Sequence, residues 1–123
     1  MITAVHTLIY SDDAETTRTF LRDVLGWPHV DTGDGWLIFK TGPSEMGVHP
    51  TSEGEWSITQ KHEISLICDD INATVADLRE KGATFKGEIE DHGFGLVIYL
   101  EIPGGAPDLM LYQPKYDPPA ITL

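Results

Sequence analysis

The chain contains two copies of one pattern, and this repeat limits the folds that it can adopt. Residues 6–26, "HTLIYSDDAETTRTFLRDVLG", and residues 63–82, "EISLICDDINATVADLREKG", share the order of strand, aspartate pair, helix and terminal glycine. A shift of 57 positions places Asp12 on Asp69 and Asp13 on Asp70. Because short strands follow each helix pattern, we expect a doubled strand–helix–strand–strand–strand unit, which belongs to the α+β class.

Each copy predicts an amphipathic helix that begins after its aspartate pair. Apolar residues recur at the spacing of one buried helical face, and a glycine marks each end. Side chains of Asp before such a stripe usually accept hydrogen bonds from the free amides of the first turn, so we interpret both pairs as helix caps rather than acid–base catalysts. The predicted stripes are Thr17, Phe20, Leu21, Val24 and Leu25 in the first copy and Ile71, Thr74, Val75 and Leu78 in the second.

Apolar runs between turn residues predict the strands. In the first half they cover residues 5–10, 36–39 and part of 43–50; in the second half they lie around residue 85 and at 96–102 and 109–112. The polar stretch 51–61 is predicted to be a linker. We therefore expect one domain, residues 1–123, with module one at 1–50, the linker at 51–61, module two at 62–114 and a tail at 115–123.

Charge and composition exclude several classes of partner. The net charge of −12 repels nucleic-acid phosphates and anionic lipid surfaces, so we expect neither nucleic acid nor membrane as a partner. Cys68 is the only cysteine, which excludes an internal disulfide and a multi-cysteine zinc site. The first residues lack the pattern of a secretory signal, so a cytoplasmic location is expected by default.

The motifs "HTLIYSDDAETTRTFLRDVLGW", "ISLICDDINATVADLREKGATF" and "GFGLVIYLEIPGGAPDLMLYQP" resemble the vicinal oxygen chelate superfamily of glyoxalases, bleomycin-resistance proteins and extradiol dioxygenases. The resemblance implies two βαβββ modules that form a curled mixed-sheet cup, commonly completed in a homodimer. It also implies a divalent metal in the cup, held by one residue from the first and one from the last strand of each module.

Two of the four implied ligand positions carry suitable residues. His6 matches the family position on the first strand, and the repeat places Glu63 at the same position in module two. The other two positions fall on Gly47, which has no side chain, and Met110, whose thioether is a poor ligand for a hard cation. Strand alternation offers His49, Glu45 and Asp108 as replacements. The predicted metal ligands are His6, Glu63 and His49, for Zn, Ni, Mn or Fe(II), and the alternative is that no metal binds.

Two functions remain open from the sequence, and no catalytic residue is assigned. The first is a metal-dependent lyase, isomerase or dioxygenase whose substrate chelates through two oxygens. The second is a metal-free cup that binds or sequesters a small aromatic or cationic molecule. In either case, a ligand pocket is predicted from Tyr10, Trp36, Glu45, Asp108, Met110 and Tyr112.

Overall fold

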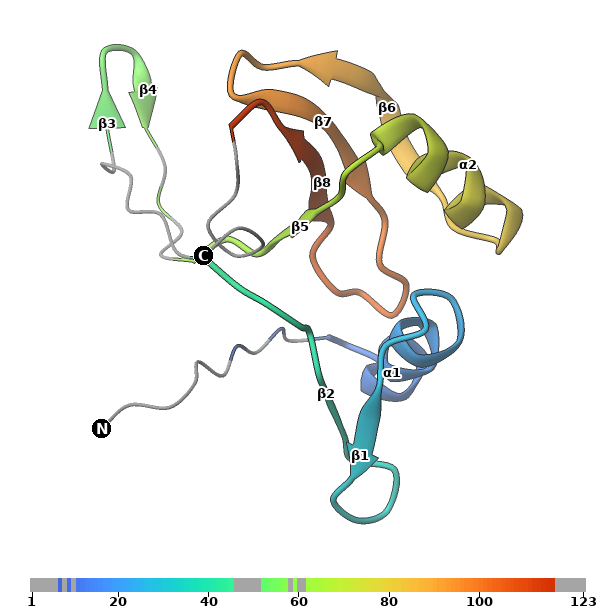
Figure 1. The fold of residues 1–123 in the computed structure, drawn as a ribbon. Coiled ribbons are helices and arrows are strands. Elements are labelled where there is room, and N and C mark those ends of the chain that lie inside the picture. The colour runs from blue at the N-terminus through green and yellow to red at the C-terminus, as the bar shows by residue number, and fades with distance from the viewer. Residues whose placement is uncertain are drawn as a thin grey trace.

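The computed structural model of the chain, which describes residues 7, 9, 11–45, 52–57, 59 and 62–116, has an α+β fold (Figure 1). Two helices, as the repeat predicts, alternate with short strands. The elements in chain order are α1 (Ala14–Asp23), β1 (His29–Asp31), β2 (Leu37–Phe39), β3 (Ser52–Glu53), β4 (Trp56–Ser57), β5 (Ser65–Ile67), α2 (Ile71–Glu80), β6 (Phe85–Asp91), β7 (Gly95–Leu100) and β8 (Leu109–Pro114).

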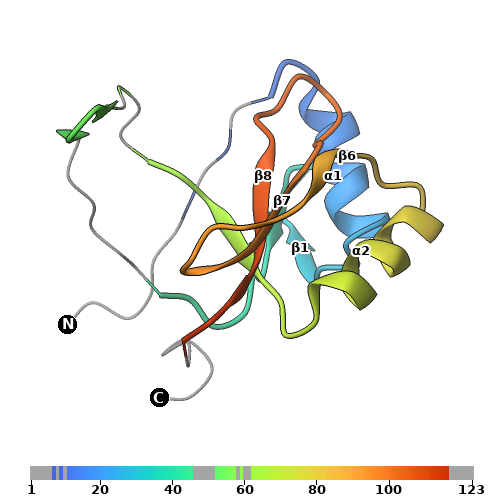
Figure 2. The ribbon, with the colours of Figure 1, turned by 90° about the horizontal axis from the view of Figure 1, so that it is seen from above.

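A four-stranded mixed sheet forms the centre of the described structure. Its strand order is β5-β8-β7-β6, in which β5 and β8 are parallel and the other neighbours are antiparallel. The pairs β1–β2 and β3–β4 form two further antiparallel hairpins. Seen from above, α1 and α2 both lie on one side of the four-stranded sheet (Figure 2). The helices therefore cover one face of the sheet, and neither of them covers the opposite face.

The hydrophobic core lies between this sheet and the two helices. Leu100 and Leu109 of neighbouring strands pack with Phe20 and Leu21 of α1. Ile98 and Leu111 of the same strands pack with Ile71 and Val75 of α2. The helix of module one is thus anchored on the sheet of module two, and the two modules share a core.

Both helices begin at the aspartates that the repeat predicts as caps. The Oδ1 atom of Asp13 accepts a hydrogen bond of 3.1 Å from the amide of Thr16, and Oδ1 of Asp70 accepts one of 3.1 Å from the amide of Ala73. The predicted capping is confirmed for Asp13 and Asp70, the second member of each pair. The buried stripe of α1 also follows the prediction, because Thr17, Phe20 and Leu21 are buried.

A turn of module two, residues 103–105, packs against the first residues of α1. The amide of Asp13 donates a hydrogen bond of 2.7 Å to the carbonyl of Gly104, and the hydroxyl of Thr17 donates one of 2.7 Å to the carbonyl of Pro103. The hydroxyl of Ser11 donates to the carbonyl of Gly104 over 2.6 Å. A Cβ at Gly104 would lie 2.5 Å from Oγ1 of Thr17 and 2.6 Å from the carbonyl oxygen of Asp13, so only glycine fits.

Several predicted segments lie partly or wholly outside the described residues. Of the predicted strand 5–10 only Thr7 and Ile9 are described, and residues 46–50 of the third predicted strand are not. Within the predicted linker 51–61 the structure contains the short hairpin of β3 and β4. His29 begins β1 and is exposed there.

We predict that Gly104→Ala lowers the free energy of unfolding by roughly 3 kcal/mol or more, because it adds a steric clash to the strain of a left-handed backbone. Gly82→Ala is the matched control: φ is +98° at Gly104 and +100° at Gly82, but a Cβ at Gly82 would meet nothing within 4 Å. The control should lose only about 1–2 kcal/mol. Urea unfolding of both variants measures the difference, and equal losses would show that the turn does not hold α1.

We also predict that Asp13 contributes to acid denaturation. Hydrogen bonds from the side chain and backbone of Thr16 lower the pKa of Asp13 below its ordinary value of 3.8. Its ionised form therefore stabilises the fold above that value, and the contribution is lost as the pH falls through the lowered pKa. Asp13→Asn keeps a capping oxygen but does not titrate. Unfolding free energies of the two proteins should converge as the pH falls from about 5 to about 2; a constant difference over that range would contradict the prediction.

Candidate functional site

The face of the four-stranded sheet opposite the helices carries a continuous row of side chains. Side chains alternate between the two faces of a strand, and Ile98, Leu100, Leu109 and Leu111 point toward the helices. Their neighbours therefore belong to the opposite face, which we call the open face. Cross-strand pairing aligns one row across it, which consists of Ser65, Met110, Tyr99 and Lys86.

One end of the open face is rich in carboxylates. Glu63, Asp108 and Glu101 flank β5, β8 and β7 at the same end of the sheet, each two residues from a member of that row. The Nζ atom of Lys86 lies 2.7 Å from Oδ2 of Asp108 and offsets part of this negative charge. We call these four residues the acidic end. A shallow hollow adjoins it, lined by Phe20, Gly82, Thr84, Lys86, Glu101, Ile102, Pro103 and Asp108.

The middle of the open face offers an aromatic ring and a thioether. Tyr99 is 40% exposed although it lies in a central strand, and its cross-strand neighbour Met110 is half-buried. Burial raises the pKa of Tyr99, and the negative charge of Glu63 raises it further. The carboxylate of Glu63 therefore acts electrostatically on this ring, as its place on the same face requires.

The other end of the open face is aromatic. The ring of Phe94 lies edge-on to the ring of Tyr112, with centroids 5.9 Å apart. The hydroxyl oxygens of Tyr112 and Tyr116 are 2.8 Å apart, and the hydroxyl of Tyr116 donates a hydrogen bond of 3.0 Å to Oε2 of Glu45. Glu45 belongs to module one and Tyr112 to module two, so this end joins the two modules.

The structure brings together some predicted pocket residues and leaves one apart from them. Asp108, Met110 and Tyr112 share one face of β8, and Glu45 reaches Tyr112 through Tyr116. Trp36 instead lies in the loop before β2, where its ring faces the guanidinium of Arg18 at 4.5 Å and is 62% exposed. Tyr10, His6 and His49 lie outside the described residues, so their predicted roles stay predictions.

The described residues do not by themselves complete a metal site. Across 7, 9, 11–45, 52–57, 59 and 62–116, no three His, Cys, Asp or Glu side chains gather in a group that could hold an ion. Asp108 is paired with Lys86, and Met110 has a poor donor for a hard cation. Within the described part, Glu63 is the one predicted ligand, and a complete set would need His6 and His49.

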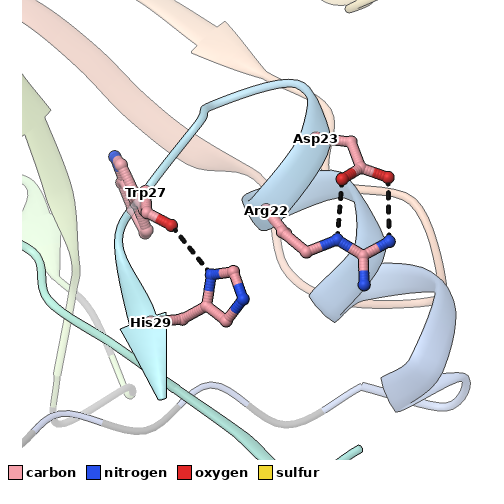
Figure 3. Close-up of polar contacts among 4 residues, drawn as sticks. All are labelled: Arg22, Asp23, Trp27 and His29. Atoms are coloured by element: carbon pink, nitrogen blue, oxygen red, sulfur yellow. Dashed lines mark hydrogen bonds and ion pairs between the residues drawn. The ribbon is translucent and has the colours of Figure 1, made fainter. Parts of the chain in front are cut away.

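A second polar cluster, formed by the last residues of α1 and the segment that follows it, has a local structural role. Nε and Nη2 of Arg22 hold the carboxylate of Asp23 at 2.7 and 2.9 Å, and Nδ1 of His29 donates to the carbonyl of Trp27 over 3.2 Å (Figure 3). Hydrogen bonds from Arg22 lower the pKa of Asp23. Because these side chains are exposed, the ion pair contributes little to stability.

Sequence reasoning did not find Tyr99, Tyr116 or Lys86 as members of the site. Tyr99 belongs to the site because it pairs with Met110 across β7 and β8, and the sequence does not show which residues of two strands pair. Tyr116 follows the last strand and its partner Glu45 is 71 residues away, which no local pattern reveals.

Among the described residues, no helix has the length and apolar character needed to cross a membrane.

Comparisons with known proteins agree with this fold. Three solved structures of similar shape are a lactoylglutathione lyase from Agrobacterium tumefaciens, the antibiotic binding protein TnmS3 from Streptomyces, and a glyoxalase/bleomycin resistance protein/dioxygenase superfamily member from Sphaerobacter thermophilus. Their identities to this chain are 17%, 20% and 22%, with TM-scores of 0.62, 0.59 and 0.59. The alignments cover 91%, 93% and 91% of this chain and 94%, 100% and 98% of the others, respectively.

No curated protein matches the chain. The profile of the Glyoxalase/Bleomycin resistance protein/Dioxygenase superfamily matches residues 3–107, which is most of the chain. The resemblance to the vicinal oxygen chelate superfamily is thereby confirmed, together with the predicted fold. The chain belongs to the glyoxalase/bleomycin resistance protein/dioxygenase superfamily.

Proposed function

We propose that this protein binds a small, positively charged aromatic molecule on the open face and needs no metal to do so. The observation that carries the proposal is the acidic end beside Tyr99 and Met110 on a face that neither helix covers. Superfamily members bind small molecules and often form dimers. For this chain we propose that a homodimer in the cytoplasm binds the ligand.

The chemistry of the face favours a cation over an anion. The three carboxylates of Glu63, Glu101 and Asp108 outnumber the single cation of Lys86, which is paired with Asp108, so the acidic end keeps a net negative charge. The exposed ring of Tyr99 can accept a cation over its π-face, and the polarizable sulfur of Met110 packs well against aromatic rings. The net charge of −12 concentrates cations near the whole surface and repels anions.

Similar structures serve both binding and catalysis, so the choice depends on this chain's own residues. TnmS3 is described as an antibiotic binding protein and the Agrobacterium structure as a lactoylglutathione lyase, at 20% and 17% identity. These identities support the fold alone. Met110, at a position where the family resemblance implies a metal-ligating glutamate, favours the binding function in this chain.

We predict that the wild-type protein binds the cationic dye proflavine saturably in the presence of a chelator, measured by fluorescence polarisation. Glu63→Gln should weaken this binding roughly fivefold, because one carboxylate beside the ligand contributes about 1 kcal/mol at an exposed face. Glu80→Gln at the exposed end of α2 removes the same charge outside the site and should leave the affinity nearly unchanged. Equal weakening in both variants would mean that only the general negative field attracts the dye.

A metal-dependent lyase, isomerase or dioxygenase is the second candidate function, favoured by the place of Glu63 on the open face. Superfamily members often use divalent metals, which stabilise negative charge on substrate oxygens. In this chain His6, Glu63 and His49 would hold the ion.

For this second candidate, we predict that Zn, Ni, Mn or Fe(II) raises the melting temperature of the wild-type protein and not that of His6→Ala or Glu63→Gln. Glu80→Gln serves again as the control for lost charge and should respond as the wild type does. A wild-type melting temperature that no metal raises would eliminate the metal-dependent function and leave the binding function intact.

A further inference from the structure

The side chain of Tyr116 occupies the aromatic end of the open face. Tyr116 lies two residues beyond β8, and its hydroxyl bridges the Tyr112 hydroxyl at 2.8 Å and the Glu45 carboxylate at 3.0 Å. Tyr112 is 8% exposed, whereas Tyr116 is 43% exposed. The inner phenol is therefore fixed in the fold, and the outer phenol lies over it at the surface.

The chemistry of Glu45 determines the direction of both hydrogen bonds. A carboxylate only accepts, so Tyr116 donates its single hydroxyl proton to Glu45. The proton in the bond between the two phenols must then come from Tyr112. Tyr112 thus offers a hydrogen-bond donor and Glu45 an acceptor, and both reach the hydroxyl of one neutral phenol. The ring of Phe94 lies edge-on beside Tyr112.

Tyr116 is held to this place by its neighbour as well as by its hydroxyl. The backbone amide of Lys115 donates a hydrogen bond of 2.9 Å to the carbonyl of Phe94, and Nζ of Lys115 lies 2.6 Å from Oδ2 of Asp91. These bonds fix the backbone before Tyr116. Its exposed ring can therefore leave by side-chain rotation while Lys115 stays in place.

We propose that Tyr112, Glu45 and Phe94 form a subsite for a neutral phenolic ring, and that Tyr116 occupies this subsite until a ligand displaces it. The inference rests on the proposed function, because it concerns the other end of the same open face. The hydroxyl of a bound phenol accepts a hydrogen bond from Tyr112 and donates one to Glu45, as Tyr116 does. A phenolate is excluded, because it has no proton to donate and the negative charge of Glu45 repels it.

The test compares p-cresol with p-methylanisole, which lacks the hydroxyl proton, in ligand-observed NMR titrations near neutral pH. Tyr116→Phe keeps the ring but loses both hydrogen bonds of the occupant, so p-cresol should bind this variant about fivefold more tightly than the wild type. In the Tyr116→Phe background, where the occupant makes neither hydrogen bond, Tyr112→Phe and Glu45→Gln should each weaken p-cresol binding about fivefold. Affinity for p-methylanisole should be much lower than that for p-cresol in both proteins, because its ether oxygen has no proton to donate to Glu45.

Glu80→Gln is the charge control for Glu45→Gln and should leave p-cresol binding unchanged. Circular dichroism melting of each variant identifies loss of fold; if Tyr112→Phe does not fold, the comparison of wild type with Tyr116→Phe decides. Unchanged or weaker p-cresol binding by Tyr116→Phe would overturn the subsite and mean that Tyr116 only clasps the two modules. Proflavine binding tests the acidic end separately. If proflavine binds as predicted but Tyr116→Phe does not bind p-cresol more tightly, the subsite is refuted and the proposed function stands.

Discussion

The packing of turn 103–105 against the start of α1 is the constraint on which the rest of the structure depends. Three hydrogen bonds join Ser11, Asp13 and Thr17 to carbonyls of this turn, and they fix the helix of module one on the sheet of module two. Because α1 and α2 then occupy the same side of the sheet, neither helix covers its opposite face (Figure 2). The position of the helices thereby leaves the face of the proposed binding site on the other side of the sheet.

The open face is polar at one end and aromatic at the other, and this polarity follows from strand alternation. Leu109 and Leu111 of β8 pack into the core, so Asp108, Met110 and Tyr112 must face the opposite way. Pairing with β7 adds Tyr99 in the middle, and pairing with β6 adds Lys86. A single alternating strand thus supplies a charge, a thioether and a phenol in sequence along the face.

The sequence predicted the elements whose signals are local. The aspartate caps and the buried stripe of α1 could be predicted because helix periodicity and capping depend on residues within a few positions of one another. Strand β1 had no such signal, since all three of its residues are exposed and its apolar pattern is absent. The bridge from Glu45 to Tyr112 and the pairing of Lys86 with Asp108 join residues far apart in the chain, which no single stretch of sequence encodes.

The most direct test of the central claim is to locate the part of the sheet that a bound ligand contacts. NMR of the protein labelled at its methionine methyl groups, titrated with proflavine, should shift the signal of Met110, because this side chain lies in the middle of the open face. Backbone amides on the exposed side of α2, such as that of Asp77, should not move. Saturable binding that shifts the α2 amides and leaves the Met110 methyl unchanged would contradict the account.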